Sequence, residues 1–129
     1  MACMRQIITS PQITPPIGPY SHAVVASGEF VYLSGQTGQN PATGEMVPGG
    51  VEAETRQVLV NLSWVLEAAG LDFASVVKCN VFLVDMADFG AMNTVFADVV
   101  PGPFPARSTV AVAALPLGAR VEIECLAVR

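Results

Sequence analysis

The chain has 129 residues, the length of one ordinary domain, and a formal net charge of −5 at pH 7. Because its few cationic residues are scattered, a nucleic-acid partner and an anionic membrane surface are both disfavoured. No apolar run approaches the roughly 20 residues of a spanning helix, and the first residues lack the apolar block of a secretory signal. We therefore expect a single cytoplasmic domain over residues 1–129.

The composition points to an assembly rather than a lone monomer. Charged residues make up 13% of the chain, against about 25% in a typical domain, while hydrophobic residues make up 52%. With so few charged residues, part of the surface of a monomer would be apolar. We therefore expect the chain to cover this surface by associating with copies of itself.

The N-terminal residues predict short strands separated by turns. Residues 6–9 fit an edge strand, and the four prolines between residues 11 and 19 enforce an extended path. Residues 20–26 and 30–34 have strand-like composition. The Ser27-Gly28 step between them predicts that they pair as a β-hairpin. The glycine-rich segment that follows predicts an irregular loop.

A long helix and a central strand are expected in the middle of the chain. Apolar residues over 51–69 recur at helical spacing, and Gly70 follows them as a stop signal. Residues 76–84 are rich in valine and aromatic side chains, which is typical of a central strand.

The C-terminal part predicts a second helix and two final strands. Asp85 or Asp88 can cap a helix that runs to about Val100. Its inward-facing stripe consists of Phe89, Met92, Phe96 and Val99. Strands over 107–113 and 120–128 follow, separated by a Leu-Pro-Leu-Gly turn.

This order of elements predicts an α+β domain with two layers, a sheet and two helices. Two amphipathic helices can cover only one face of such a sheet, so the other face is expected to meet a neighbouring subunit. In the last strand, alternation places Val121 and Ile123 toward the helices and Glu122 and Glu124 on the uncovered face.

Alternation in the preceding strand places Val110 and Val112 toward the helices, and Arg107, Thr109 and Ala111 on the uncovered face. An arginine and two carboxylates would then lie where subunits join. The register between the strands is not readable from the sequence, so which glutamate approaches the arginine stays open.

Arg107 has two interpretations. It can be a strand-end residue or the partner of Glu122 or Glu124 in a structural ion pair. It can instead bind a carboxylate ligand, because guanidinium offers a flat two-donor fork and stays charged when partly buried. The glutamates can likewise be interface residues, or one of them can serve as a general base for water.

Other catalytic patterns are absent from the sequence. His22 is the single histidine, which excludes a three-histidine metal site. The three cysteines, Cys3, Cys79 and Cys125, are far apart and fit free thiols rather than a zinc or redox motif. No phosphate-binding or dinucleotide fingerprint is present, so no cofactor is indicated.

Four segments resemble the Rid family of reactive intermediate deaminases, also called the YjgF or L-PSP family. They are IGPYSHAV at 17–24, YLSGQTGQNPATGE at 32–45, VVKCNVFLVDM at 76–86, and FPARSTVAVAALPLGARVEIECLAVR at 104–129. The resemblance implies a chorismate-mutase-like fold with two helices on one face of a mixed, mainly antiparallel sheet. It also implies a homotrimer with active sites in the clefts between subunits.

The activity implied by the resemblance is hydrolysis of 2-enamine and 2-imine acids to 2-oxo acids and ammonia without a cofactor. The substrates would be 2-aminoacrylate, 2-iminopropanoate and 2-iminobutanoate. Arg107 matches the family's carboxylate-binding arginine, and Glu122 matches the glutamate that positions water. Tyr20, Ser34 and Asn93 match substrate-pocket positions.

Thr109 matches a further substrate-binding position at which several relatives carry cysteine, so any role for a thiol there is in doubt. Two alternative functions remain. The chain can be a non-catalytic 2-oxo-acid binding or chaperone-like module, or an endoribonuclease that inhibits translation.

Overall fold

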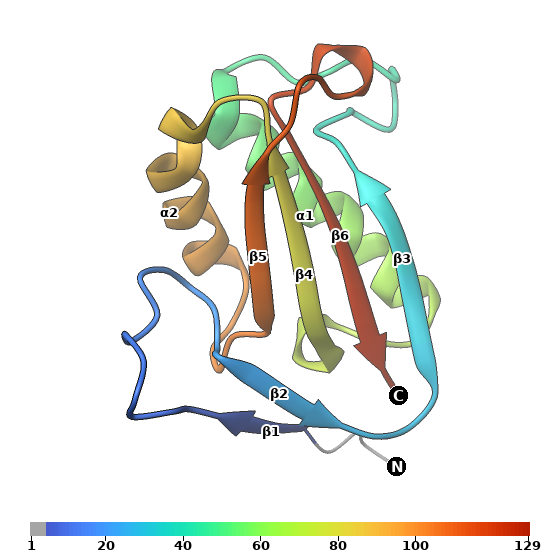
Figure 1. Ribbon diagram of the computed structural model, residues 1–129. Helices are drawn as coiled ribbons and strands as arrows, with labels where there is room; N and C mark the ends of the chain where they lie inside the picture. The colour runs from blue at the N-terminus through green and yellow to red at the C-terminus, as the bar shows by residue number, and fades with distance from the viewer. Residues whose placement is uncertain (1–4) are drawn as a thin grey trace.

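The computed structural model describes residues 5–129 and shows a sheet with helices on one face (Figure 1). The sheet has the strand order β3 (Phe30–Gln36), β6 (Val121–Val128), β4 (Val76–Leu83) and β5 (Ala106–Ala111). Strand β6 is antiparallel to both β3 and β4, whereas β4 and β5 are parallel. The sheet is therefore mixed and mainly antiparallel, as the family resemblance implies.

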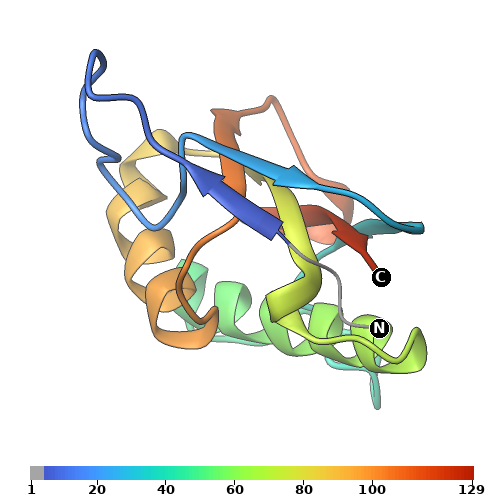
Figure 2. The same cartoon turned by 90° about the horizontal axis from the view of Figure 1, so that it is seen from below.

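Helices α1 (Gly50–Ala68) and α2 (Phe89–Val99) lie on the same side of this sheet (Figures 1 and 2). Each helix connects two strands that run in the same direction, which gives two β-α-β units. Strand β6 lies between the two strands of the first unit, β3-α1-β4, whereas the strands of the second, β4-α2-β5, are neighbours. Fully buried side chains from both layers fill the space between them: Val58, Leu62 and Leu66 of α1, Met92 and Phe96 of α2, and Val81 and Ile123 of the sheet. The predicted two-layer α+β architecture is confirmed.

The predicted faces of the last strand are also confirmed. Val121, Ile123 and Cys125 are buried against the helices, while Glu122 and Glu124 alternate with them and are only partly buried. The alternation is clear because β6 is an interior strand whose helix-facing positions are all apolar.

The predicted β-hairpin is wrong. Strand β2 (Ala23–Ala26) pairs with β1 (Arg5–Ile8) in a separate two-stranded ribbon, whereas β3 pairs with β6. This ribbon lies across the end of the main sheet at which β4 begins (Figures 1 and 2). Gly28, with φ of +138°, turns the chain from one sheet into the other instead of folding it back.

The predicted faces of β5 are wrong as well. The parallel register places Arg107 beside Cys79 and Thr109 beside Val81, and both of these β4 residues are buried against the helices. Val110, by contrast, is 48% exposed. The prediction assumed that the valines of β5 face the core. This assumption fails because β5 is an edge strand, where apolar residues can lie on the exposed face.

The start of the second helix is more complex than expected. Asp85 caps a short 3-10 turn, Met86–Asp88, by accepting the backbone N–H of Ala87, and α2 begins only at Phe89. Asp88 occupies the N-cap position of α2, but its side chain makes no capping hydrogen bond there and its carboxylate accepts from Arg120 instead.

The single histidine and the two cysteines within residues 5–129 have the structural settings that the sequence suggested. His22 is structural, since Nδ1 accepts from the backbone of Ser10 and Nε2 contacts the carbonyl of Thr14. Cys79 and Cys125 are free thiols, while Cys3 lies outside the described residues. Within residues 5–129, no helix is both long and apolar enough to cross a membrane.

Candidate functional site

Arg107 lies under α2 at the edge of the sheet, surrounded by aromatic rings. Its side chain is 9% exposed, and its Cζ atom lies 5.6 Å from the ring centre of Tyr20, 5.9 Å from Phe89 and 5.1 Å from Phe96. Such rings attract a cation through their negative faces. Two of them come from α2, so the apolar stripe of this helix also forms the wall around the arginine.

The guanidinium of Arg107 has polar contacts on one side only. Nη2 donates to Oδ1 of Asn93 at 2.6 Å, and Nη1 approaches Sδ of Met92 at 3.9 Å. Nε is buried and has no hydrogen-bond partner among the described residues. The guanidinium of Arg107 is therefore held in place while at least one of its N–H donors, that of Nε, makes no hydrogen bond to the described residues.

The electrostatic environment leaves this cation poorly compensated. Burial lowers the pKa of Arg107, and negative charge on Cys79 or Tyr20 would raise it. Within residues 5–129, Arg107 forms no ion pair with a carboxylate. A structural ion pair with Glu122 or Glu124 is therefore excluded within one chain, and the arginine is suited to an external anion.

The N-terminal segment closes over the free edge of β5 beside this arginine. Ser21 donates from its backbone N–H to the carbonyl of Pro105, and its hydroxyl donates to the carbonyl of Phe104. A Cβ atom on Gly18 would lie 3.0 Å from Nδ2 of Asn93 and 3.4 Å from Nη2 of Arg107. Glycine at this position therefore allows the segment to approach both side chains.

Tyr20 and Thr109 complete the surroundings of Arg107. The hydroxyl oxygen of Tyr20 accepts the backbone N–H of Ile17 at 3.2 Å, which orients its ring. Thr109 lies two residues beyond Arg107 on the same face of β5, and its Oγ1 is buried without a hydrogen-bond partner among the described residues. Arg107, Asn93, Tyr20 and Thr109 form what we call the arginine cluster.

Glu122 lies on the opposite face of the sheet. Its register partner on β4 is Phe82, which alternates with the buried Val81, and it is partly exposed. Its carboxylate lies against Gly35 of β3, where a Cβ atom would collide with Oε2. Ser34, which precedes this glycine, is exposed. We call Glu122, Ser34 and Gly35 the glutamate cluster.

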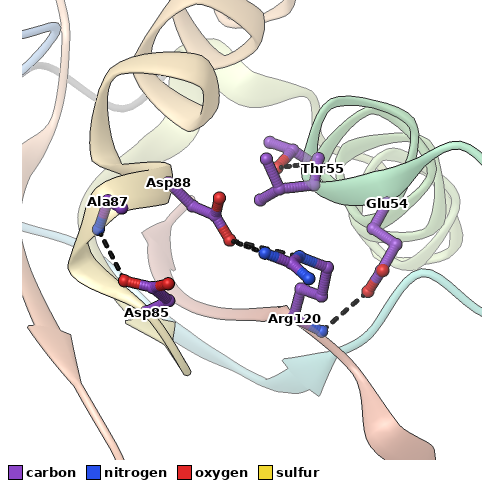
Figure 3. Close-up of polar contacts among 7 residues, drawn as sticks. Glu54, Thr55, Asp85, Ala87, Asp88 and Arg120 are labelled. Carbon is purple, nitrogen blue, oxygen red and sulfur yellow. Dashed lines mark hydrogen bonds and ion pairs between the residues drawn. The ribbon is translucent and has the colours of Figure 1, made fainter.

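Arg120, which lies two residues before Glu122, is held by polar contacts just before the start of β6 (Figure 3). The backbone N–H of Arg120 donates to Oε1 of Glu54, a buried carboxylate of α1, at 2.8 Å. The Arg120 guanidinium forms an ion pair with Asp88 at 2.8 Å. The hydrogen bond and charge of Asp88 raise the pKa of Arg120. These contacts connect β6 to the beginnings of both helices.

The two clusters are separated by the sheet itself. Arg107 is on β5 and Glu122 on β6, with β4 between them, so their strands lie two strand spacings, about 10 Å, apart. The two residues also differ by three positions along β4, because Arg107 pairs with Cys79 and Glu122 pairs with Phe82. Their side chains also leave opposite faces. One chain cannot bring both groups to the same small molecule.

A hollow in the surface lies away from both clusters. Its volume is about 400 Å³, and its lining includes Gln36, Asn61 and Trp64 between the 36–44 loop and α1. It contains none of the predicted site residues. Among residues 5–129, no cluster of three or more histidine, cysteine or acidic side chains could hold a metal ion.

Sequence reasoning missed several neighbours of the two key side chains. Phe89, Met92 and Phe96 were assigned only to the core, although they also surround the arginine. Gly18 and Gly35 were not singled out as site residues. Their positions next to Tyr20 and Ser34 in the GPY and SGQ motifs are the signals that could have identified them.

Comparison with known proteins finds one matching family and several relatives of similar length. The family model described as Endoribonuclease L-PSP matches residues 11–129. The 2-iminobutanoate/2-iminopropanoate deaminase of Capra hircus is 48% identical over 126 residues, covering 98% of this chain and 91% of that protein.

Solved structures have the same fold. RidA from the Antarctic bacterium Psychrobacter sp. PAMC 21119 has a TM-score of 0.76 and 43% identity, covering 96% of this chain and 99% of that one. The Rid protein YyfB from Yersinia pestis has a TM-score of 0.87 and 34% identity, covering 97% and 98%. With both a family match over nearly the whole chain and close full-length relatives, this chain belongs to the endoribonuclease L-PSP family, also known as the Rid family.

Proposed function

We propose that this chain hydrolyses 2-imino acids and their enamine tautomers to 2-oxo acids and ammonia. The relative from Capra hircus named 2-iminobutanoate/2-iminopropanoate deaminase supports this activity. The observation that carries the proposal is the buried guanidinium of Arg107, which has no carboxylate partner within residues 5–129 and keeps an unused Nε donor. A substrate carboxylate would supply the missing negative charge and accept two parallel hydrogen bonds.

The complete active site requires a second chain. Because the arginine and glutamate clusters leave opposite faces of the sheet, Glu122 of one subunit would meet Arg107 of another. The open face also carries apolar side chains that an assembly would cover: Tyr32 is 78% exposed and Val110 is 48% exposed. A homotrimer with a site at each subunit boundary satisfies both requirements.

The reaction needs little more than positioning and proton transfer. Arg107 holds the carboxylate, so the adjacent C=N carbon is fixed at the subunit boundary. Glu122 accepts a proton from water as the water oxygen bonds to that carbon, and it passes this proton to the imine nitrogen, which gives a carbinolamine. Glu122 then takes the hydroxyl proton of the carbinolamine and transfers it to the amino group, so the C–N bond breaks, ammonia leaves and the C=O bond forms. An enamine substrate first takes a proton at its terminal carbon and becomes the imine.

The remaining residues would orient these groups. Asn93 fixes the guanidinium through Oδ1, which leaves its Nδ2 as a donor to the substrate. Tyr20 packs its ring against the guanidinium. The unused hydroxyl of Thr109 can donate to the same carboxylate, and exposed Ser34 can hydrogen-bond the water or the leaving nitrogen beside Glu122.

An assay with a dehydratase tests the proposal directly. A pyridoxal-phosphate-dependent threonine dehydratase releases 2-iminobutanoate, whose disappearance is followed with and without this protein. We expect the purified chain to accelerate the loss of imine and the appearance of 2-oxobutanoate. If the decay is unchanged while calorimetry detects binding of 2-oxobutanoate, the protein is a binding module and the deaminase proposal is wrong.

Replacing Gly35 with alanine should impair the reaction by displacing Glu122. The new Cβ would overlap the Glu122 carboxylate, which must then rotate away from its place. We expect kcat to fall about 10-fold or more with little change in KM, because the arginine cluster still binds the carboxylate. Gly90→Ala is the matched control, since a Cβ there meets nothing within 4 Å. Equal kcat values for the two variants would contradict the prediction.

The charge distribution offers no support for RNA as the substrate. Three exposed arginines, Arg56, Arg120 and Arg129, are paired with Asp98, Asp88 and Glu29. With a net charge of −5, and with only Arg5, Lys78 and Arg107 outside these ion pairs within residues 5–129, the described part of the chain presents few free cations to an RNA backbone.

A further inference from the structure

Cys79 and Cys125 face each other across two neighbouring strands of the sheet. Neither cysteine has a role in the proposed reaction. Cys79 of β4 and Cys125 of β6 are direct partners in the antiparallel register. Their Sγ atoms are 3.3 Å apart, and the residues are only 2% and 7% exposed. Both are free thiols.

The backbone geometry of this pair suits a covalent bond. Directly opposed residues on antiparallel strands have Cα atoms about 4.5 to 5.5 Å apart, inside the range of about 4.4 to 6.8 Å found in disulfides. The two sulfurs already point at one another, and bonding would bring them to about 2.0 Å. The strands need only a small local adjustment.

The pair also adjoins the arginine cluster. Cys79 is flanked by Cys125 on one side and by Arg107 of β5 on the other. Because Cys79 and Arg107 are register partners on neighbouring strands, negative charge on Cys79 would raise the pKa of Arg107. The hydrogen bond to Cys79, together with burial, raises the pKa of Cys125, so this thiol keeps its proton.

We propose that Cys79 and Cys125 form a redox-active dithiol that a peroxide converts into a cross-strand disulfide. The sulfur of Cys79 attacks one peroxide oxygen and the O–O bond breaks, which gives a sulfenic acid and, with hydrogen peroxide, one water molecule. The sulfur of Cys125 then displaces the sulfenic oxygen, which leaves as a second water. Both sulfurs are oxidised by one electron each, and the peroxide is reduced.

The oxidised form would differ measurably from the reduced form. The new bond joins residues 46 positions apart and ties β4 to β6 in the core. A crosslink that closes a loop of this length restricts the unfolded chain, so we expect the midpoint of thermal unfolding to rise by about 5 °C or more. Dithiothreitol should reverse both the bond and this shift.

Mass spectrometry of peroxide-treated protein tests the proposal. A Cys3→Ser background removes the thiol outside the described residues, so only Cys79 and Cys125 can react. After hydrogen peroxide, removal of its excess and alkylation in denaturant, we expect neither thiol to be alkylated and a proteolytic fragment that links the two. Cys79→Ala and Cys125→Ala, each in the same background, are matched controls that cannot form this bond.

Each result bears on the dithiol alone, because none of these measurements depends on deaminase activity. The proposal would be overturned if both cysteines of protein that was folded during the peroxide treatment are still fully alkylated afterwards in denaturant. Sulfinic acid without a crosslink would also overturn it. Disulfides that appear only between chains would also overturn it. If either alanine variant fails to fold, the linked fragment from the Cys3→Ser protein still decides the question.

Discussion

Replacing Arg107 with methionine should lower kcat/KM for 2-iminobutanoate by at least about 100-fold, or about 2.7 kcal/mol of transition-state stabilisation. Methionine keeps much of the apolar stem but removes every donor to the substrate carboxylate. Arg107→Lys should be nearly as inactive, because a point charge cannot reproduce the flat two-donor fork held by Asn93. The measurement is the dehydratase assay at several substrate concentrations.

The same substitution should leave the fold intact. Arg107 is buried without a carboxylate partner within residues 5–129, and burial lowers its pKa, so the folded protein bears a desolvation cost at this position that no opposite charge offsets. Replacing such a cation with an apolar side chain is expected to keep or raise the midpoint of thermal unfolding. A large loss of stability together with the loss of activity would show that the arginine is structural and contradict its proposed role.

Arg56→Met is the matched control. Arg56 is an exposed arginine of α1 paired with Asp98, and it lies in neither cluster. Its replacement removes one cation from the surface and should leave kcat/KM within about two-fold of wild type. A comparable loss of activity in this variant would indicate that general surface charge, rather than the buried fork, governs the reaction.

Two inactive variants should regain activity when they assemble together. Glu122→Gln removes the base and is expected to lower kcat by about 100-fold or more. If every site combines Arg107 of one chain with Glu122 of another, a mixture of Arg107→Met and Glu122→Gln chains contains some intact sites. With equal amounts and random assembly, we expect about a quarter of the wild-type activity. The chains are mixed in denaturant, refolded together and assayed.

The double variant provides the control for this experiment. Chains carrying both Arg107→Met and Glu122→Gln, refolded with an equal amount of wild-type chains, should also give about a quarter of full activity if sites are shared between chains. Sites contained within one chain would instead give about half of full activity here. They would give no recovery when the two single variants are mixed, and that outcome would refute the shared site.

Local periodicity predicted most of the individual elements. Helix α1 could be read from apolar spacing and from Gly70, whose φ of +76° suits the end of a helix. The faces of β6 followed from strict alternation, because an interior strand buries one side along its whole length. Strand alternation made Arg107, Glu122 and Glu124 candidate site residues, and the resemblance of the final segment then singled out Glu122 from the two glutamates.

Pairing between distant segments could not be read in the same way. The hairpin expected around Gly28 does not form, because strand pairing depends on how much surface the whole sheet buries. Strand β3 pairs with β6 over a longer stretch than the short strand β2 could provide. The prediction of which side of β5 faces α2 was wrong, because the valines of an edge strand need not point toward the core. Aromatic rings and Asn93 of α2 instead enclose the arginine.

The sequence by itself therefore determined the helices, the strands, the scarcity of charge and the family motifs, since these depend on side chains a few positions apart. Only the tertiary structure decided that Arg107 and Glu122 leave opposite faces and that Cys79 meets Cys125. Both facts depend on strand order and register. Those are set by how the whole sheet packs against two helices, and residues dozens of positions apart come together only in that packing.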